Sequence, residues 1–429
     1  MKFVSKFTLA TAMAFGMAAV VPMAPASAQE EAAQFNAANI SEAVRGPVAA
    51  AQTALQEEGT DLAAVRAQLE TAAGAIQNND DRFIVGQLML QLGVKMQQAG
   101  QPADQVQTVQ GRGLRLAVDS NLLPTAQRST YYGFLGNMAN QAENWPEAIE
   151  AYTEALRYNP NNADAAIQLA LAQFRSNNNA AGYEAADRAF AAAQEAGTDI
   201  PANWVTVPLN AAIQARDVER ISTYGPLLVS IEPTPAVWSQ TLLGYASAAR
   251  LDDQATLDVM RLLRAANALD QATYTEYANL ALRRGYPGEA QSVIEEGQAA
   301  GVTFDGETTS EVQSRLSSDR SSLGEARASA ASDANGMVAL NTADAYVGYG
   351  EYGPAMELYR LAKEKGGIDT SPVDLRMAAA LYAQNQTAQA RQAFESVTGS
   401  RETLAKFWLA WLDQQGGAEA AAPAESATE

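Results

Sequence analysis

Carboxylates are the main side chains of this 429-residue sequence that are able to perform acid–base chemistry, because it contains 49 Asp and Glu residues and neither His nor Cys. The two missing residue types exclude Ser-His-Asp triads, cysteine nucleophiles, and metal sites built on imidazole or thiolate. A hydrolase that uses two carboxylates stays open. The acidic residues are scattered and no pair stands out, so we predict no catalytic residue, no metal site and no cofactor.

Local motifs for nucleotide or calcium binding are also missing. No phosphate loop or dinucleotide fingerprint occurs in the sequence. The segment Asn78-Asn79-Asp80-Asp81 is acidic but lacks the alternating ligands and the terminal Glu of a calcium loop. We predict that it forms a turn and a helix cap, and that Asp252-Asp253 is a turn between helices. These observations favour a binding protein over an enzyme.

The most regular pattern in the sequence is a 34-residue frame at 129–162. Large side chains at Tyr132, Leu135 and Tyr152 have the spacing needed to fill the space between two packed helices. Small residues between them let the two backbones approach closely. Proline then ends the second helix, because it lacks the N–H of a continuing helix. The predicted repeat-packing residues are Tyr132, Leu135, Gly136, Ala139, Ala148, Tyr152, Ala155 and Pro160.

The turn inside this frame predicts how the second helix begins. Asn144 is a suitable N-cap, and Glu147 lies three residues later, as in a capping box. Pro146 fits the first turn, where its missing N–H costs little.

The frame recurs along the chain with decreasing fidelity. Further frames preserve the packing positions at about 169–189, 274–297, 343–362 and 378–397. The turns at Trp145-Pro146, Tyr286-Pro287 and Tyr352-Gly353-Pro354 share the same chemistry. Self-similarity at this period predicts stacked helical hairpins, each of which needs a neighbour to bury its apolar face.

The frame resembles the tetratricopeptide-repeat superfamily, most specifically at 129–197 and 329–399 and more weakly at 273–302. Together with the N-terminal leader described below, the chain is similar to exported repeat proteins of Gram-negative envelopes. The resemblance implies an all-α fold, an α-solenoid of stacked helix-turn-helix repeats.

In this superfamily the first helix of each repeat lines a concave groove that binds peptides or partner helices. The resemblance implies that five residues of this sequence lie there: Asn137, Asn140, Gln141, Phe174 and Arg175. The amides are able to hydrogen-bond a peptide backbone, and Arg175 is able to pair with a carboxylate. Gly133 stands where the carboxylate-clamp subset has Lys, so clamp-type binding of acidic C-termini is not expected. The alternative is that these polar residues are only solvated.

The first 28 residues have the features of a secretory leader. Lys2 and Lys6 precede an apolar run at 7–21, and Ala26-Ser27-Ala28 forms a small-residue cleavage site. We predict cleavage after Ala28, with Ala26 and Ala28 as the recognised residues. An uncleaved anchor is the alternative, but the run is short for a membrane span. The leader predicts a periplasmic protein, or a secreted one, without an integral membrane span after cleavage.

The chain is strongly acidic, with a formal net charge of −20 that becomes −22 when Lys2 and Lys6 leave with the leader. Such a surface repels nucleic acid and anionic lipid, so neither is an expected partner. It favours basic partners, or serves solubility alone. The lack of cysteine means that the exported protein needs no disulfide.

Changes in composition predict how the chain is organised. Helical repeats are expected over 29–302, with the best units at 129–197 and 273–302, followed by a polar connecting helix at 303–336. This helix is also the expected place for a bend between two lobes. C-terminal repeats and an aromatic capping helix with Phe407, Trp408 and Trp411 are expected at 337–415. Residues 416–429 are predicted to be a disordered acidic tail.

The sequence therefore predicts a non-enzymatic periplasmic scaffold or adaptor that binds a peptide or helix of a protein partner in its concave groove. One alternative is a carboxylate-based enzyme, or enzyme subunit, that processes envelope glycans. Another is a structural protein that self-assembles through its tail or through the Trp408 and Trp411 end. The sequence defines neither the partner nor the oligomeric state.

Overall fold

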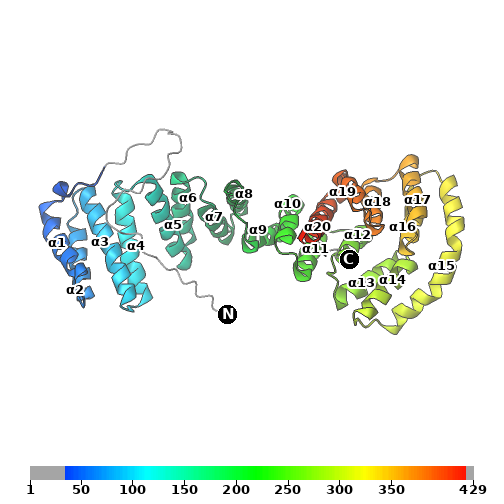
Figure 1. The fold of residues 1–429 in the computed structure, drawn as a ribbon, viewed down its shortest axis with the longest axis horizontal. Coiled ribbons are helices and arrows are strands. Elements are labelled where there is room, and N and C mark those ends of the chain that lie inside the picture. Colours follow the sequence, from blue (N-terminus) through cyan, green and yellow to red (C-terminus); the bar gives the residue numbers. More distant parts are fainter. Residues whose placement is uncertain (1–33, 422–429) are drawn as a thin grey trace, which may run out of the picture. The chain divides into compact units, whose positions relative to one another are not determined.

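The computed structural model describes residues 34–421, which form helices without any strand. The predicted all-α class of stacked helical hairpins is confirmed. The chain divides into two compact units, an N-terminal unit of residues 1–199 and a C-terminal unit of residues 200–429 (Figure 1). No helix among residues 34–421 is both long and apolar enough to cross a membrane. The predicted leader, with Ala26 and Ala28, lies outside the described residues.

The N-terminal unit consists of four helical hairpins, in which each odd-numbered helix packs on the helix that follows it. A short 3₁₀ turn, η1 (Ala37–Asn39), precedes them. The helices are α1 (Glu42–Gln56), α2 (Leu62–Gly74), α3 (Asn79–Gln98), α4 (Ala103–Asp119), α5 (Thr125–Gln141), α6 (Trp145–Tyr158), α7 (Ala163–Arg175) and α8 (Asn179–Glu195).

The C-terminal unit contains five hairpins, a long single helix and a terminal helix. The hairpins are α9 (Ala202–Ala215) with α10 (Val218–Ile231), α11 (Pro235–Ala249) with α12 (Asp253–Ala265), α13 (Gln271–Arg283) with α14 (Pro287–Ala299), α16 (Met337–Gly348) with α17 (Tyr352–Lys365), and α18 (Ser371–Ala383) with α19 (Thr387–Glu395). The remaining elements are α15 (Gly306–Ser332), η2 (Gly399–Arg401) and α20 (Glu402–Ala421).

Each hairpin turn contains one residue in the left-handed region, which reverses the chain between two antiparallel helices. Four turns use glycine, which adopts this conformation without strain. Five use other residues. The left-handed turn residues are Gly59, Gly100, Glu143, Asn177, Arg216, Arg250, Gly285, Gly350 and Asn385.

Side-chain caps explain where many of the helices begin. Asn78, as predicted, caps α3 by accepting a hydrogen bond of 2.9 Å from the N–H of Asp81. Asp252 caps α12 in the same way, through the N–H of Ala255 at 2.8 Å. The predicted capping box at Asn144 is wrong.

Asn144 is indeed the N-cap of α6, but its side chain accepts no hydrogen bond from the helix. Its amide instead donates to the Glu147 carboxylate at 2.8 Å. The carboxylate of Glu147 also pairs with Arg115 of α4, so it is directed away from the backbone of the cap.

The predicted packing positions of α5 and α6 lie where the two helices meet. Ala148, Ala155 and Tyr152 are buried at 0%, 0% and 1% exposure. A side chain on Gly136 would place its Cβ 2.5 Å from Cε1 of Tyr152, so only glycine fits there without a shift. Tyr132 is only half-buried, and its ring stacks on Tyr158 with centroids 5.8 Å apart.

The acidic segment at the start of α3 does more than form a turn. The Asp80 carboxylate accepts hydrogen bonds from the N–H of Asn36 at 2.6 Å and from the Asn39 amide at 3.1 Å. The buried Asp81 accepts from the N–H of Ser41 at 2.8 Å and from that of Gln77 at 2.9 Å. These contacts fasten the segment before α1 onto α3.

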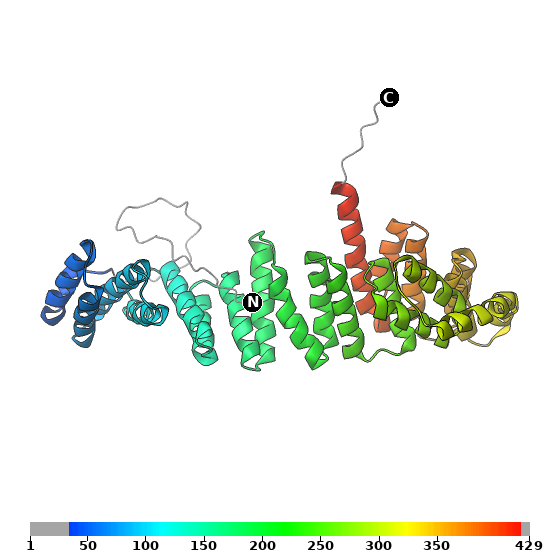
Figure 2. The same cartoon turned by 90° about the horizontal axis from the view of Figure 1, so that it is seen from below.

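The terminal helix α20 brings the end of the C-terminal unit back to its beginning. It packs on α10 and α12 as well as on the preceding α18 and α19, and Figures 1 and 2 show it beside the green helices of the same unit. The ring of Phe407 meets Trp238 and Tyr245 of α11 at 6.4 and 6.1 Å. Trp408 stacks on Phe394 at 5.1 Å, as expected for a cap on the previous repeat.

Two expectations about organisation are corrected. The division between the units falls at residues 199 and 200, whereas the segment 303–336 holds the single helix α15 inside the C-terminal unit. The bend was expected there because the segment is rich in Ser and Asp, yet polar residues also suit a helix with a solvated face. The predicted tail at 416–429 begins too early, since α20 continues to Ala421. Ala and Glu favour helix strongly enough to extend it past two glycines.

Candidate functional site

The predicted groove residues lie on two neighbouring helices of the N-terminal unit. Asn137, Asn140 and Gln141 belong to the C-terminal half of α5, and Phe174 and Arg175 end α7. The two helices contact each other directly. Gln141 and Arg175 are exposed, and Asn140 is half-buried. The Gln141 side-chain oxygen accepts a hydrogen bond of 3.0 Å from Gln107 of α4.

Asn137 has a packing role within its hairpin. Its side-chain oxygen accepts a hydrogen bond of 2.8 Å from the hydroxyl of Tyr152 on α6. The C-terminal unit repeats this arrangement, since Tyr359 of α17 donates to Asp344 of α16 at 2.7 Å, across the same separation of 15 residues. The position therefore serves to accept a hydrogen bond from a buried tyrosine hydroxyl, which ties the Asn137 side chain to its own hairpin.

Phe174 also contributes to its own hairpin. Its ring meets that of Tyr183 on α8 edge-on, with centroids 5.1 Å apart. A Cβ on Gly182 would lie 2.9 Å from the Phe174 ring, so the glycine makes room for this contact. Asn140, Gln141 and Arg175 remain as the groove candidates, and of these Gln141 is also bonded to Gln107 of the neighbouring hairpin.

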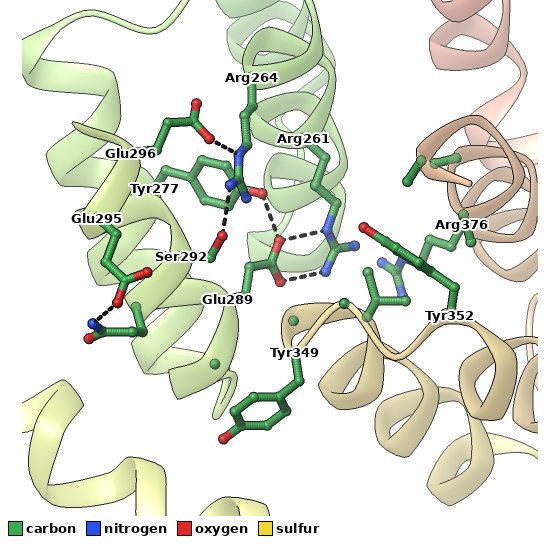
Figure 3. A pocket seen from close by; sticks show the side chains of 18 of the residues that line it. Arg261, Arg264, Tyr277, Glu289, Ser292, Glu295, Glu296, Tyr349, Tyr352 and Arg376 are labelled. Atoms are coloured by element: carbon green, nitrogen blue, oxygen red, sulfur yellow. Dashed lines mark hydrogen bonds and ion pairs between the residues drawn. The ribbon is translucent and has the colours of Figure 1, made fainter. Parts of the chain in front are cut away.

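A larger concave site, which the sequence did not reveal, lies in the C-terminal unit. It is a cavity of about 1320 Å³, called here the central cavity. Its walls are one face each of α14, α15 and α18, together with the end of α12 and the turn between α16 and α17 (Figure 3). The charged, polar and aromatic residues of the wall include Arg261, Arg264, Glu289, Glu295, Glu296, Gln313, Ser317, Arg320, Tyr349 and Tyr352.

Ion pairs fix most of the charged groups on the cavity wall. Arg261 of α12 binds both carboxylate oxygens of Glu289 on α14, each at 2.8 Å (Figure 3). Arg264, one turn later, binds Glu296 at 2.7 Å and donates to the Ser292 hydroxyl at 2.7 Å. Bidentate pairs of this kind hold side chains in one orientation, so the wall is already arranged before a ligand arrives.

A buried ionic cluster of six residues lies beside the cavity and joins five elements of the C-terminal unit. At its centre Asp258 of α12 accepts hydrogen bonds from Arg376 of α18 at 2.8 and 3.0 Å, and from Arg401 of η2 at 2.9 Å. Arg376 also binds Asp344 at 2.8 Å. The members of the cluster are Asp258, Arg261, Glu289, Asp344, Arg376 and Arg401.

The electrostatics of the cavity do not favour acid–base catalysis by Glu289. Burial opposes its ionisation, but the Arg261 guanidinium and hydrogen bonds from Arg261 and Tyr277 outweigh this and hold its pKa below the ordinary value. Burial, followed by the nearby Glu289 charge, raises the pKa of Tyr277. A general acid needs a raised carboxyl pKa, which is the opposite of this arrangement. Within residues 34–421, no three acidic side chains gather as a metal site.

The cavity and the ionic cluster could not be recognised from single residues, because Asp258, Asp344 and Arg376 look like ordinary charged positions of helices. One position in the sequence does indicate the ionic cluster. The repeat frame places Asp344 where the earlier repeat has Asn137, at a position that faces the partner helix. A carboxylate at such a buried position requires a cationic partner.

Comparison with known proteins identifies the repeat in the N-terminal unit. A family model described as a TPR repeat matches residues 136–177, which run from α5 through α6 to the end of α7. The chain therefore contains a tetratricopeptide repeat. The matched segment of this tetratricopeptide repeat includes Gly136, Tyr152 and the groove candidates Asn140, Gln141 and Arg175.

Solved structures of repeat proteins are also similar to the chain. The yeast Sti1 TPR2AB domain in its pHSP90 complex has 15% identity over 66% of this chain and 98% of that one, with a TM-score of 0.25. A tetratricopeptide repeat protein from Parabacteroides merdae has 12% identity over 76% and 98%, with a TM-score of 0.22. Pseudomonas aeruginosa pilF has 17% identity over 69% and 99%, with a TM-score of 0.17. No curated protein sequence matches the chain.

Proposed function

We propose that this protein is a non-enzymatic interaction scaffold of the periplasm, which binds a peptide or helix of a protein partner on the α5 and α7 surface. The observation that carries the proposal is the tetratricopeptide repeat itself. The matched segment contains Asn140, Gln141 and Arg175, which the packing of the hairpins does not require. Stacked helices hold these side chains on a preformed surface, so binding costs little ordering entropy.

The arrangement of carboxylates supports binding over catalysis. The cavity carboxylates Glu289 and Glu296 are both bound by arginines, and the pKa of Glu289 is lowered.

The burial of the α20 tryptophans argues against the self-assembly alternative. Trp408 and Trp411 are buried at 3% and 9% exposure, so they do not offer an apolar patch to a second copy. Export to the periplasm is supported by the leader pattern at 1–28.

Crosslinking in cells, followed by affinity purification and mass spectrometry of the envelope fraction, tests the proposal. The groove variant replaces Asn140, Gln141 and Arg175 with Ala. Its matched control replaces Asn179, Gln194 and Arg157, which are exposed residues of the same types on α6 and α8. We expect one or two reproducible partners that the groove variant loses and the control retains. Equal capture by both variants would place the partner site elsewhere.

A further inference from the structure

The wall of the central cavity carries groups able to bind a ligand, and this possibility is independent of the proposed partner surface on α5 and α7. Three helix faces supply most of its wall, and each shows helical spacing. Gly288, Gln291, Ser292 and Glu295 come from α14, whereas Gln313, Leu316, Ser317, Arg320 and Ser321 come from α15. Arg376, Ala379, Ala380 and Ala383 come from α18. These three faces together line the cavity.

The charges on the wall are largely cancelled by partners within the protein. Arg261 and Arg264 pair with Glu289 and Glu296, and Arg320 pairs with Glu351 at 3.1 Å. The Glu295 carboxylate is the exception: within residues 34–421 it forms no ion pair and accepts a hydrogen bond from Gln291. Arg376 is held by the ionic cluster. A ligand with a large net charge would lose its hydration and find few counter-charges in return. The ligand chemistry that fits this balance is uncharged.

The wall also carries uncharged polar groups that an apolar ligand would leave without hydrogen bonds. Gln313 donates to Gln291 at 2.9 Å across the cavity edge, and Ser317, Ser321 and Asn267 add further donors and acceptors. An apolar ligand would remove water from these groups without replacing their hydrogen bonds, which is costly. Ligand groups that both donate and accept hydrogen bonds, such as hydroxyls, avoid that cost.

Tyrosine rings give the cavity wall flat aromatic surfaces. Tyr349 lies in the turn between α16 and α17, Tyr352 begins α17, and both line the cavity (Figure 3). The Tyr349 ring is held within the wall: it packs on the backbone of Gly288, the Arg320 guanidinium lies 5.1 Å from its centroid, and its hydroxyl donates to Asp319 at 2.6 Å. Tyr352 is therefore the ring considered for ligand contact. Flat aromatic rings with a polar edge suit ligands that combine apolar C–H faces with hydroxyl groups.

We propose that the central cavity binds an uncharged oligosaccharide. The paired guanidinium and carboxylate groups present donors and acceptors at fixed spacing to vicinal hydroxyls, and the Tyr352 ring contacts the C–H face of a sugar ring. The volume of about 1320 Å³ exceeds the roughly 300–1,000 Å³ of usual small-molecule sites, so the cavity accommodates several rings.

Calorimetric titration of the full-length protein with chitotetraose, cellotetraose and maltotetraose tests the proposal. Ser317→Phe fills the cavity from α15, whereas Ser318→Phe adds the same ring to the next residue, which does not line it. Both serines are exposed, so both variants are expected to fold, and circular dichroism checks this. We expect saturable binding of at least one sugar, a loss of about tenfold or more in affinity for Ser317→Phe, and no change for Ser318→Phe.

Further arms of the same experiment separate the alternatives. Tyr352→Ala should weaken binding by about tenfold, and Tyr158→Ala in the N-terminal unit should not. Sedimentation with insoluble chitin and cellulose distinguishes a polymer ligand from free oligosaccharides, and binding to either source supports the proposal. Binding of none of these sugars, equal binding by Ser317→Phe, or a preference for a serine–glycine peptide of matched length overturns it.

Discussion

At the scale of single residues, Gly136 shows how the repeat depends on the absence of a side chain. Its backbone touches the Tyr152 ring, with only 2.5 Å between Cε1 and the place of a Cβ. We expect Gly136→Leu to lower the free energy of unfolding by about 1–3 kcal/mol or more, because the hairpin α5–α6 must move apart. Denaturant unfolding followed by circular dichroism measures this.

Gly133 provides the matched control on the same helix. A Cβ there meets no atom within 4 Å. Gly133→Ala is therefore expected to be neutral or to stabilise α5 by up to about 1 kcal/mol, because alanine favours helix over glycine. Equal destabilisation by the two substitutions would contradict the assigned repeat frame.

The lowered pKa of Asp81 predicts that the stability of the N-terminal unit depends on pH. Burial opposes its ionisation, but hydrogen bonds from the Gln77 and Ser41 N–H groups outweigh this and hold its pKa below the ordinary 3.8. Because the folded-state pKa is lowered, its stabilisation is complete above about pH 4 and is lost as the pH falls through the folded-state pKa.

We expect Asp81→Asn to destabilise the N-terminal unit at about pH 7, and the difference from the unmodified protein to shrink as the pH falls below about 4. Thermal unfolding across this pH range measures the difference. Asp199→Asn, at an exposed position between the units, serves as the control and should have no such effect. A difference that is constant with pH would show that the carboxylate charge of Asp81 is not responsible.

At the scale of helices, the ionic cluster joins elements that are far apart in the sequence. Arg376 of α18 binds Asp258 of α12 across 118 residues. We expect Arg376→Met to lower the free energy of unfolding of the C-terminal unit by about 3–5 kcal/mol, because two buried carboxylates lose their partner. Arg360→Met, on the exposed face of α17, is the control. An effect of Arg376→Met below about 1 kcal/mol would mean that water compensates these carboxylates.

Much of the helical architecture could be predicted, because the repeat pattern specifies contacts between helices that are adjacent in the sequence. Tyr152, Gly136 and Ala155 act between helices that are adjacent in the sequence, so their spacing indicates their contacts. The contacts of Asp258 with Arg376 and Arg401 depend on the accumulated curvature of many hairpins, which no single repeat specifies. The same reason explains why Phe407 was expected to contact only the preceding repeat but also meets Trp238.

The candidate site was predictable only in part, because the same residue type serves packing and recognition. Asn137 and Phe174 have groove spacing, but the Tyr152 hydroxyl and the Tyr183 ring bind them within their hairpins. The central cavity arises between one face each of α14, α15 and α18. This property depends on where other helices lie, and the polar composition of α15 alone indicated only a connecting helix.

At the scale of the whole molecule, the division into two units predicts where the folded protein is most easily cut. Residues 197–199 precede α9, are exposed and lie outside any helix. We expect limited proteolysis with an enzyme of broad specificity to cut first at about 197–200 and to yield two resistant fragments, because helices protect their backbones. Mass spectrometry of the fragments locates the cut, and a first cut inside α15 would show that the long helix opens more readily.

The return of α20 to α10 also has a consequence for biosynthesis. During synthesis each hairpin of the N-terminal unit is able to pack as soon as its second helix has left the ribosome. Asp258 and Trp238, in contrast, acquire Arg401 and Phe407 only when the last helix is complete. The nascent C-terminal unit therefore lacks one of the three arginine partners of Asp258, and Phe407 does not yet cover the Trp238 indole, until translation is nearly finished, which makes it the part of the chain that most needs protection from aggregation.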